Sequence, residues 1–146
     1  AMYYIFHAKD LPATPDGRNA GEVLPANFTP SMFLRQKGPV SVMRSFSKPH
    51  LEDAINGGPL TIELDESIFR SDETVEKLAM LIRSYVRMGG HQLQLNTLNK
   101  EKLIDAKKHP ELHKNLIVRV WGWSGYFNEL DIKYQNHIIR RIEHTV

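Results

Sequence analysis

The sequence predicts an α/β fold, because segments with strand character alternate along the chain with segments of helical character. Residues 60–64 alternate apolar and polar side chains as a strand does, and so do residues 93–97. Between them, apolar residues recur at helical spacing over 72–87. With 146 residues the chain has the length of one domain, and we interpret 1–146 as a single domain.

The first half of the chain holds the weaker predictions. Residues 3–6 and 40–46 are candidate strands, since both are rich in apolar and β-prone side chains. Residues 10–26, rich in Pro, Gly, Asp and Asn, predict an ordered loop. Residues 51–55 predict one helical turn.

The second half predicts three helices with recognisable ends. Ser71 or Asp72 can cap the first helix, and the glycines at 89–90 end it. Asn99 caps a short helix that stops before Pro110. Asp131 can cap a final helix over 131–146, preceded by a glycine loop over 116–130. The side chains expected on buried helical faces are Val75, Leu78, Ala79, Ile82, Tyr85, Val86, Leu103, Ile104, Ala106, Tyr134, Ile138 and Ile142.

Composition excludes several classes of function. The net charge of +2 and pI of about 8.9 are too mild to indicate nucleic-acid binding. No apolar run has the length of a membrane span and no signal peptide is recognised, so we expect a cytoplasmic protein without membrane contact. The chain has no cysteine, which excludes disulfides and thiol catalysis within it. The histidines lack the i, i+4 pairing of metal ligands within one predicted helix, so we expect no metal and treat them as surface or helix-end residues.

The start, Ala1-Met2, is interpreted as a remnant of tag removal before a native methionine, with internal excision as the alternative.

The most unusual stretch runs from residue 119 to residue 127. Gly122 lies between Trp121 and Trp123, and Gly125 follows within the same aromatic stretch. Glycine in such surroundings marks a special φ or a close backbone approach, and the rings can bury the loop away from water. A radical on a glycine Cα is delocalised over the adjacent amide and carbonyl, and a side chain would hinder its planarity. The alternative is a tight turn that simply needs glycine.

This stretch resembles the C-terminal signature of the glycyl radical enzymes, the pyruvate formate-lyase-like family. The matching residues are Arg119, Val120, Gly122, Trp123, Ser124, Phe127, Leu130, Gln135, Ile138, Ile139 and Arg141. Gly122, not Gly125, falls on the radical position. Earlier segments resemble other family runs in the same order, at 13–18, 20–22, 38–39, 42, 45–48, 89–91, 96, 103, 105–106 and 109–110.

The resemblance implies that the chain is the C-terminal portion of a ten-stranded β/α barrel. It implies that Gly122 stores a glycyl radical, supported by a loop formed by Arg119, Val120, Trp121, Trp123, Ser124, Tyr126 and Phe127. Asp16, Gly17 and Arg18 would form a loop near the barrel mouth, and their alternative interpretation is a plain turn with an exposed ion pair.

By resemblance, an iron–sulfur, S-adenosylmethionine-dependent activase installs the radical, which then passes to a cysteine that starts anaerobic, oxygen-sensitive lyase or C–C bond chemistry. This chain has no cysteine, so a cysteine-bearing partner chain is implied, and the chain alone would be inactive and bind no cofactor. Alternatives are a stand-alone spare-part radical protein and a non-catalytic binding module that keeps the fold. The substrate stays open, although the turn at 57–59 and Trp121 favour a fumarate-adding or arylacetate-acting relative over pyruvate chemistry.

Overall fold

The computed structural model describes residues 3–34, 37–120 and 122–143, and a β-α-β unit lies at its centre. Strands β1 (Pro59–Asp65) and β2 (Gln92–Leu98) are parallel, paired from Pro59 with Gln92 to Asp65 with Leu98. Helix α3 (Asp72–Arg87) connects them. Parallel strands joined by a helix confirm the predicted α/β class. The ten-stranded barrel implied by resemblance is a larger structure than the described residues contain.

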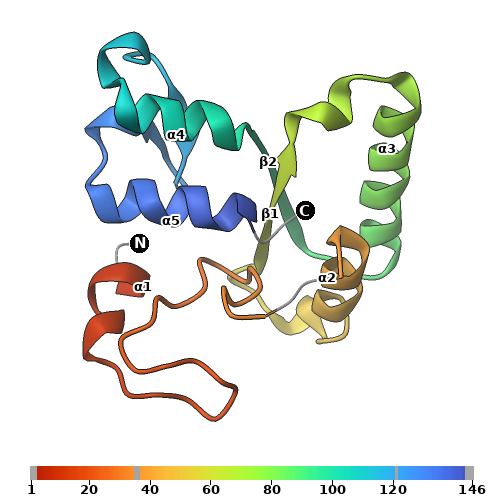
Figure 1. Ribbon diagram of the computed structural model, residues 1–146. Helices are drawn as coiled ribbons and strands as arrows, with labels where there is room; N and C mark the ends of the chain where they lie inside the picture. Colours follow the sequence, from red (N-terminus) through yellow and green to blue (C-terminus); the bar gives the residue numbers. More distant parts are fainter. Residues whose placement is uncertain (1–2, 35–36, 121, 144–146) are drawn as a thin grey trace.

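The other elements surround this unit (Figure 1), with α3 on one side of the two strands and α4 and α5 on the other. In chain order they are α1 (Tyr3–Phe6), η1 (Ala8–Asp10), α2 (Pro39–Phe46), η2 (Leu51–Asp53), η3 (Glu66–Phe69), α4 (Lys100–Lys108), η4 (Pro110–Leu112), β3 (Ile117–Arg119), β4 (Ser124–Tyr126), η5 (Phe127–Glu129) and α5 (Ile132–Glu143).

The predicted helix ends are confirmed by hydrogen bonds from main-chain amides to capping side chains. The Ser71 hydroxyl accepts from the amide of Thr74 at 3.3 Å. Asn99 accepts from the amide of Lys102 at 2.8 Å, which starts α4. These bonds satisfy amides that have no partner within their own helix. Asp131 plays a similar part before α5, where its carboxylate accepts from the amide of Lys133 at 2.8 Å.

The strands predicted over residues 3–6 and 40–46 are wrong. Residues 3–6 form the single turn α1, and residues 39–46 form helix α2. Gly38 precedes α2 and Pro39 occupies its first turn, a position where proline is favoured because the missing amide would have no helical partner. Val42, Met43 and Phe46 then pack at helical spacing against the β-α-β unit, so tertiary packing overrides the β propensity of this segment.

The buried apolar side chains form two separate clusters. We call the first the hairpin cluster, because it surrounds β3 and α5; it contains Tyr4, Ile5, Ala26, Leu103, Ala106, Val118, Val120, Phe127, Tyr134, Ile138 and Ile142. We call the second the β-α-β cluster; it contains Met43, Leu60, Ile62, Leu64, Leu78 and Tyr85. The two clusters share no buried residue, so the two halves of the structure meet along a boundary that we call the seam.

Strand β1 is buried on both faces. Leu60, Ile62 and Leu64 point into the β-α-β cluster, and the alternating Thr61 and Glu63 point to the opposite face of the strand. The polar face is covered by α5, whose Arg141 reaches Glu63. The alternation read from the sequence is therefore real, but the polar side lies at the seam and not in solvent.

Helix α3 has a narrower buried face than its sequence suggests. Leu78 and Tyr85 are buried, whereas Val75, Ile82 and Val86 are exposed.

Within the described ranges, no helix is long and apolar enough to span a bilayer.

His137 on α5 is buried, so its assignment as a surface histidine is wrong. Its ring lies edge-on to Tyr4 with ring centroids 5.1 Å apart, and neither ring nitrogen has a hydrogen-bond partner in the described part of the chain. Burial is the main cause, and together with the positive charges of Arg141 and Arg140 it lowers the pKa of His137 to about 3. The folded protein therefore keeps this ring neutral in ordinary buffers.

We predict that His137 makes the chain less stable as the pH falls below about 6.5, the pKa of an unfolded histidine. In the unfolded chain His137 then binds a proton, whereas in the folded chain it does not. This difference lowers the free energy of unfolding by up to about 1.4 kcal/mol per pH unit. Replacement His137→Phe keeps an aromatic ring and abolishes this contribution. Urea denaturation of both proteins at pH 7, 6 and 5 measures the difference. Equal pH dependence of the two proteins would contradict the prediction.

Candidate functional site

The glycine stretch folds as a β-hairpin. Strands β3 and β4 are antiparallel, with Val118 opposite Gly125 and Arg119 opposite Ser124. The amide of Val120 donates to the carbonyl of Trp123 at 2.9 Å, which closes the connection that contains Gly122. The sequence predicted the strand before the glycine but missed β4, because three residues that include a glycine carry little strand signal.

Gly122 is exposed at the tip of this hairpin. Its φ is +71°, in the region where residues with side chains are strained, and a Cβ added to it would meet no atom of the described residues within 4 Å, its two chain neighbours aside. Backbone conformation, and not crowding, is what favours glycine here. The tight-turn interpretation is therefore correct for the conformation. The same geometry leaves the Cα hydrogens of Gly122 open to another molecule.

Among the described residues, the rings of Trp123 and Tyr126 do not bury the glycine tip, which corrects the expectation that they bury the loop. Trp123 is 41% exposed and Tyr126 is 42% exposed. Phe127 differs, because it is fully buried in the hairpin cluster and anchors the end of β4. Trp121 lies outside the described residues.

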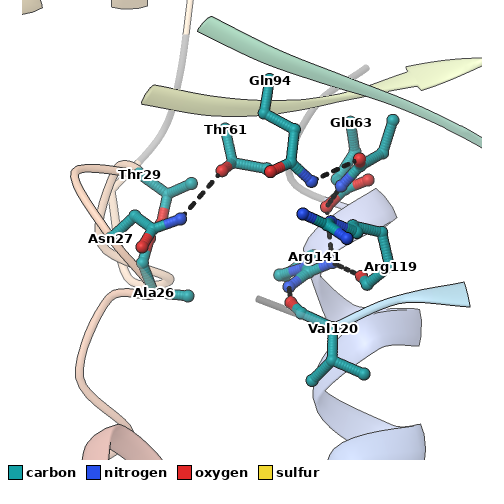
Figure 2. A network of polar contacts seen from close by, with 10 residues as sticks. Ala26, Asn27, Thr29, Thr61, Glu63, Gln94, Arg119, Val120 and Arg141 are labelled. Carbon is teal, nitrogen blue, oxygen red and sulfur yellow. Dashed lines mark hydrogen bonds and ion pairs between the residues drawn. The ribbon is translucent and has the colours of Figure 1, made fainter. Parts of the chain in front are cut away.

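One side chain, Arg141 of α5, holds the main chain just before the glycine tip (Figure 2). Its Nη1 donates to the carbonyl of Val120 at 2.7 Å and its Nη2 donates to the carbonyl of Arg119 at 3.1 Å. Its Nη2 also lies 2.6 Å from Oε1 of Glu63. The planar guanidinium can serve several acceptors at once, which a lysine ammonium does less well.

Glu63 completes this contact from the centre of β1. Its side chain is 5% exposed, and Asn96 of β2 donates to the same carboxylate oxygen at 3.2 Å. Burial raises the pKa of Glu63, while the positive charge of Arg141 and the hydrogen bond from Asn96 act in the opposite direction. The ion pair therefore connects α5, the hairpin and the β-α-β unit.

Two amide side chains fix the other end of the hairpin. Nε2 of Gln135 donates to the carbonyls of Phe127 and Leu130, both at 3.1 Å. Asn128 donates to the carbonyls of Pro110 and His113, both at 3.0 Å. The loop after β4 is thus tied to α5 and to the segment that leads into β3.

The sequence indicated some of these residues and missed others. Gln135 and Arg141 belong to the resembling pattern, but nothing in the sequence gave them a role. Glu63 was missed, although a carboxylate inside an apolar strand signals a buried charge that needs a partner. Of the predicted supporting residues, Val120 is buried and Arg119 lies 3.4 Å from the hydroxyl of Ser124 across the hairpin.

Arg18 is buried, so the alternative of an exposed ion pair in the 16–18 turn is wrong. It is 3% exposed, and its guanidinium donates to the carbonyls of Pro12, Asn19 and Glu22. All of these hydrogen bonds stay within its own loop, and none reaches the hairpin. Asp16 is exposed, and Gly17 has a φ of +101°. In the part of the chain that is described, Arg18 thus organises a loop and is not brought to Gly122.

The described residues contain no group of three His, Cys, Asp or Glu side chains that could hold a metal ion. His113 pairs with Asp105 instead, with its Nε2 2.7 Å from a carboxylate oxygen. This hydrogen bond lowers the pKa of Asp105.

Comparison with known proteins identifies the family of this hairpin. The family model described as "Glycine radical" matches residues 24–128, which include both β1 and the tip at Gly122. Among curated relatives, trans-4-hydroxy-L-proline dehydratase of Clostridioides difficile is 32% identical over 143 residues, covering 97% of this chain and 18% of that protein. The probable dehydratase YbiW of Escherichia coli K12 is 36% identical over 136 residues, covering 92% of this chain and 17% of that protein.

Solved structures agree with this assignment. The glycerol-bound B12-independent glycerol dehydratase of Clostridium butyricum superposes with a TM-score of 0.89 at 36% identity, over 95% of this chain and 18% of that one. Hydroxyproline dehydratase of Clostridioides difficile gives a TM-score of 0.85 at 31% identity, over 98% of this chain and 18% of that one. The chain thus spans less than a fifth of these relatives, in each of which the matched region is part of one longer polypeptide. The match to the family model over most of the chain, and these relatives, show that the chain belongs to the glycyl radical enzyme family.

Proposed function

We propose that this chain is the radical-bearing module of an anaerobic glycyl radical enzyme and that Gly122 stores the radical. The observation that supports this most directly is the geometry of the hairpin tip. Gly122 occupies the radical position of the resembling signature and is exposed, and among the described residues only its chain neighbours could lie within 4 Å of the place where a Cβ would lie. Another protein can therefore reach its Cα.

The proposed reaction consists of hydrogen-atom transfers. An activase with an iron–sulfur cluster and S-adenosylmethionine removes one hydrogen atom from the Cα of Gly122. A cysteine thiol then returns a hydrogen atom to this Cα, which restores the glycine and leaves a thiyl radical on sulfur. The thiyl radical abstracts hydrogen from the substrate.

The cysteine must come from outside these 146 residues, because they contain none. A partner chain or another part of a longer polypeptide can supply it, and the second source fits the relatives, of which this chain spans 17% or 18%. The module alone is then inactive. The relatives include dehydratases, an indoleacetate decarboxylase and an isethionate sulfite-lyase, so the proposal extends to the radical step and not to a substrate.

A binding module that retains the fold is the second candidate. The exposed rings of Trp123 and Tyr126 beside the tip favour it, because such rings commonly contact a partner protein. The stand-alone spare-part protein is a variant of the first proposal and shares its radical chemistry. The following tests separate the radical proposal from the binding module.

We predict that anaerobic incubation with the cognate activase, S-adenosylmethionine and a reductant gives an organic doublet in electron paramagnetic resonance. Gly122→Ala should abolish the doublet. The matched control is Gly89→Ala, because Gly89 has a φ of +83° and equally open surroundings, so both variants carry similar backbone strain. Gly125→Ala should also keep the doublet, but it is a less clean control, since its Cβ would lie 2.8 Å from the ring of Trp123. A doublet that persists in Gly122→Ala would contradict the proposal.

We further predict that air cleaves the activated protein at Gly122, because a Cα radical reacts with dioxygen and the backbone then breaks. Mass spectrometry should find a fragment that begins near Trp123. The unactivated protein, exposed to the same air, should stay intact. If the doublet has been observed and only intact chain is found after exposure, the radical does not lie at Gly122.

The radical proposal also requires two positions of the tip, one beside the cysteine and one open to the activase. We predict that a cysteine-bearing partner slows hydrogen exchange across residues 118–130, since it covers Trp123 and Tyr126 and biases the equilibrium between the two positions. The isolated chain should exchange faster there or self-associate. Slow exchange in a lone monomer, unchanged by the partner, would favour the non-catalytic module.

A further inference from the structure

We infer that Glu63 and Arg141 form a latch that holds the glycine hairpin against the β-α-β unit and so sets the position of Gly122. Neither residue touches the reacting atom, so both are positioning residues. The inference deepens the proposed function, but its first test does not require a radical.

The place of the pair in the fold is the first argument. Glu63 lies on β1, whose neighbours in the strand belong to the β-α-β cluster. Arg141 lies on α5 beside Ile142, which belongs to the hairpin cluster. The ion pair, with 2.6 Å between Nη2 and Oε1, therefore crosses the seam between two clusters whose core residues differ. Apolar burial holds each half together, and this charged contact joins the halves, alongside the hydrogen bond from Asn27 to Thr61 and the packing of Leu98 against the hairpin cluster.

The second argument is what else Arg141 holds. Its guanidinium also binds the carbonyls of Arg119 and Val120, the last described residues before the tip. The same side chain thus fixes the base of the glycine turn and attaches it to β1. If Glu63 loses its charge, the ion pair across the seam is lost, and breaking a buried ion pair by removing one partner is strongly unfavourable. Separation of the seam relieves this by admitting water.

Gln135 provides a built-in comparison. It holds the carbonyls of Phe127 and Leu130 at the far end of the hairpin, but both belong to the same half of the structure as α5. Loss of Gln135 should therefore loosen the hairpin on α5 without opening the seam. Loss of Glu63 should move α5 and the hairpin together, relative to β1 and α3.

The chain has no cysteine, so distances across the seam can be measured by introducing two. We would place spin labels at Arg83→Cys on α3 and Arg140→Cys on α5, both at exposed positions, and use double electron–electron resonance. The labelled protein should give one narrow distance distribution. Glu63→Gln and, separately, Arg141→Lys should add a second, longer population of about a tenth of the molecules or more.

Two variants serve as controls. Glu73→Gln breaks an ion pair with Lys77 of the same 2.6 Å length that lies exposed on α3, and should leave the distance unchanged. Gln135→Leu should also leave it unchanged, while amide exchange of Phe127, which donates to Leu116, becomes about tenfold faster. The latch is wrong if Glu63→Gln and Arg141→Lys both keep the single distance, or if they open the seam no more than Glu73→Gln does. If one of them does not fold, the other decides.

A second measurement separates the latch from a merely structural role. With the cysteine-bearing partner and the activase both present, Glu63→Gln should acquire the doublet faster than the unmodified protein, because the tip leaves the cysteine more often, and should lose it faster in air. A structural defect would instead lower the yield. If the distance changes while no doublet forms in any variant, the latch stands and the proposed function fails; if the distance is unchanged while the doublet forms normally, the latch fails alone.

Discussion

The buried ion pair between Glu63 and Arg141 is the contact on which the rest of the arrangement depends. Removing two charges from water costs free energy, which their attraction offsets only if the remaining donors and acceptors find partners. Here Asn96 supplies a donor to the carboxylate and the hairpin supplies two carbonyls to the guanidinium. These contacts offset part of the cost, although Oε2 of Glu63 has no hydrogen-bond partner among the described residues. The ion pair and the hairpin therefore stabilise each other.

This mutual stabilisation explains how Gly122 can be exposed and still be held in a defined position. The tip of a short hairpin has few contacts of its own, and Gly122 contributes no side chain to fix it. Its position is set at a distance, through carbonyls held by Arg141 before the turn and by Gln135 after it. These two restraints lie on the side away from the tip, so in the described part of the chain they leave the Cα of Gly122 open. An exposed glycine whose hairpin is held by side chains on neighbouring elements agrees with the membership of the chain in the glycyl radical enzyme family.

The sequence predicted the features that depend on local chemistry, such as the caps at Ser71 and Asn99 and the parallel arrangement implied by strand, helix and strand. Predictions from the sequence were wrong where tertiary packing determines the secondary structure or the burial of a residue. The segment at 40–46 has β-prone residues but forms α2, because its helical face covers the β-α-β cluster. His137 looked like a surface residue, since one polar side chain does not disturb the apolar period of α5. Glu63 could be found only as an anomaly, because its partner lies 78 residues away in the chain and no local pattern links the two.

The sheet formed by β1 and β2 has a further consequence. In the described residues each strand pairs with the other alone, so each leaves one row of main-chain donors and acceptors at a sheet edge. Outside this pairing, the amide of Phe28 donates to the carbonyl of Pro59 and the hydroxyl of Tyr85 donates to the carbonyl of Gln92. Parallel strands normally belong to larger sheets that are covered on both faces. An uncovered edge is a template for any other strand, whether from a longer polypeptide or from a second copy. Pairing at this edge should therefore limit the solubility of the separate chain. A solvent-facing lysine or proline introduced on β2 should prevent such pairing.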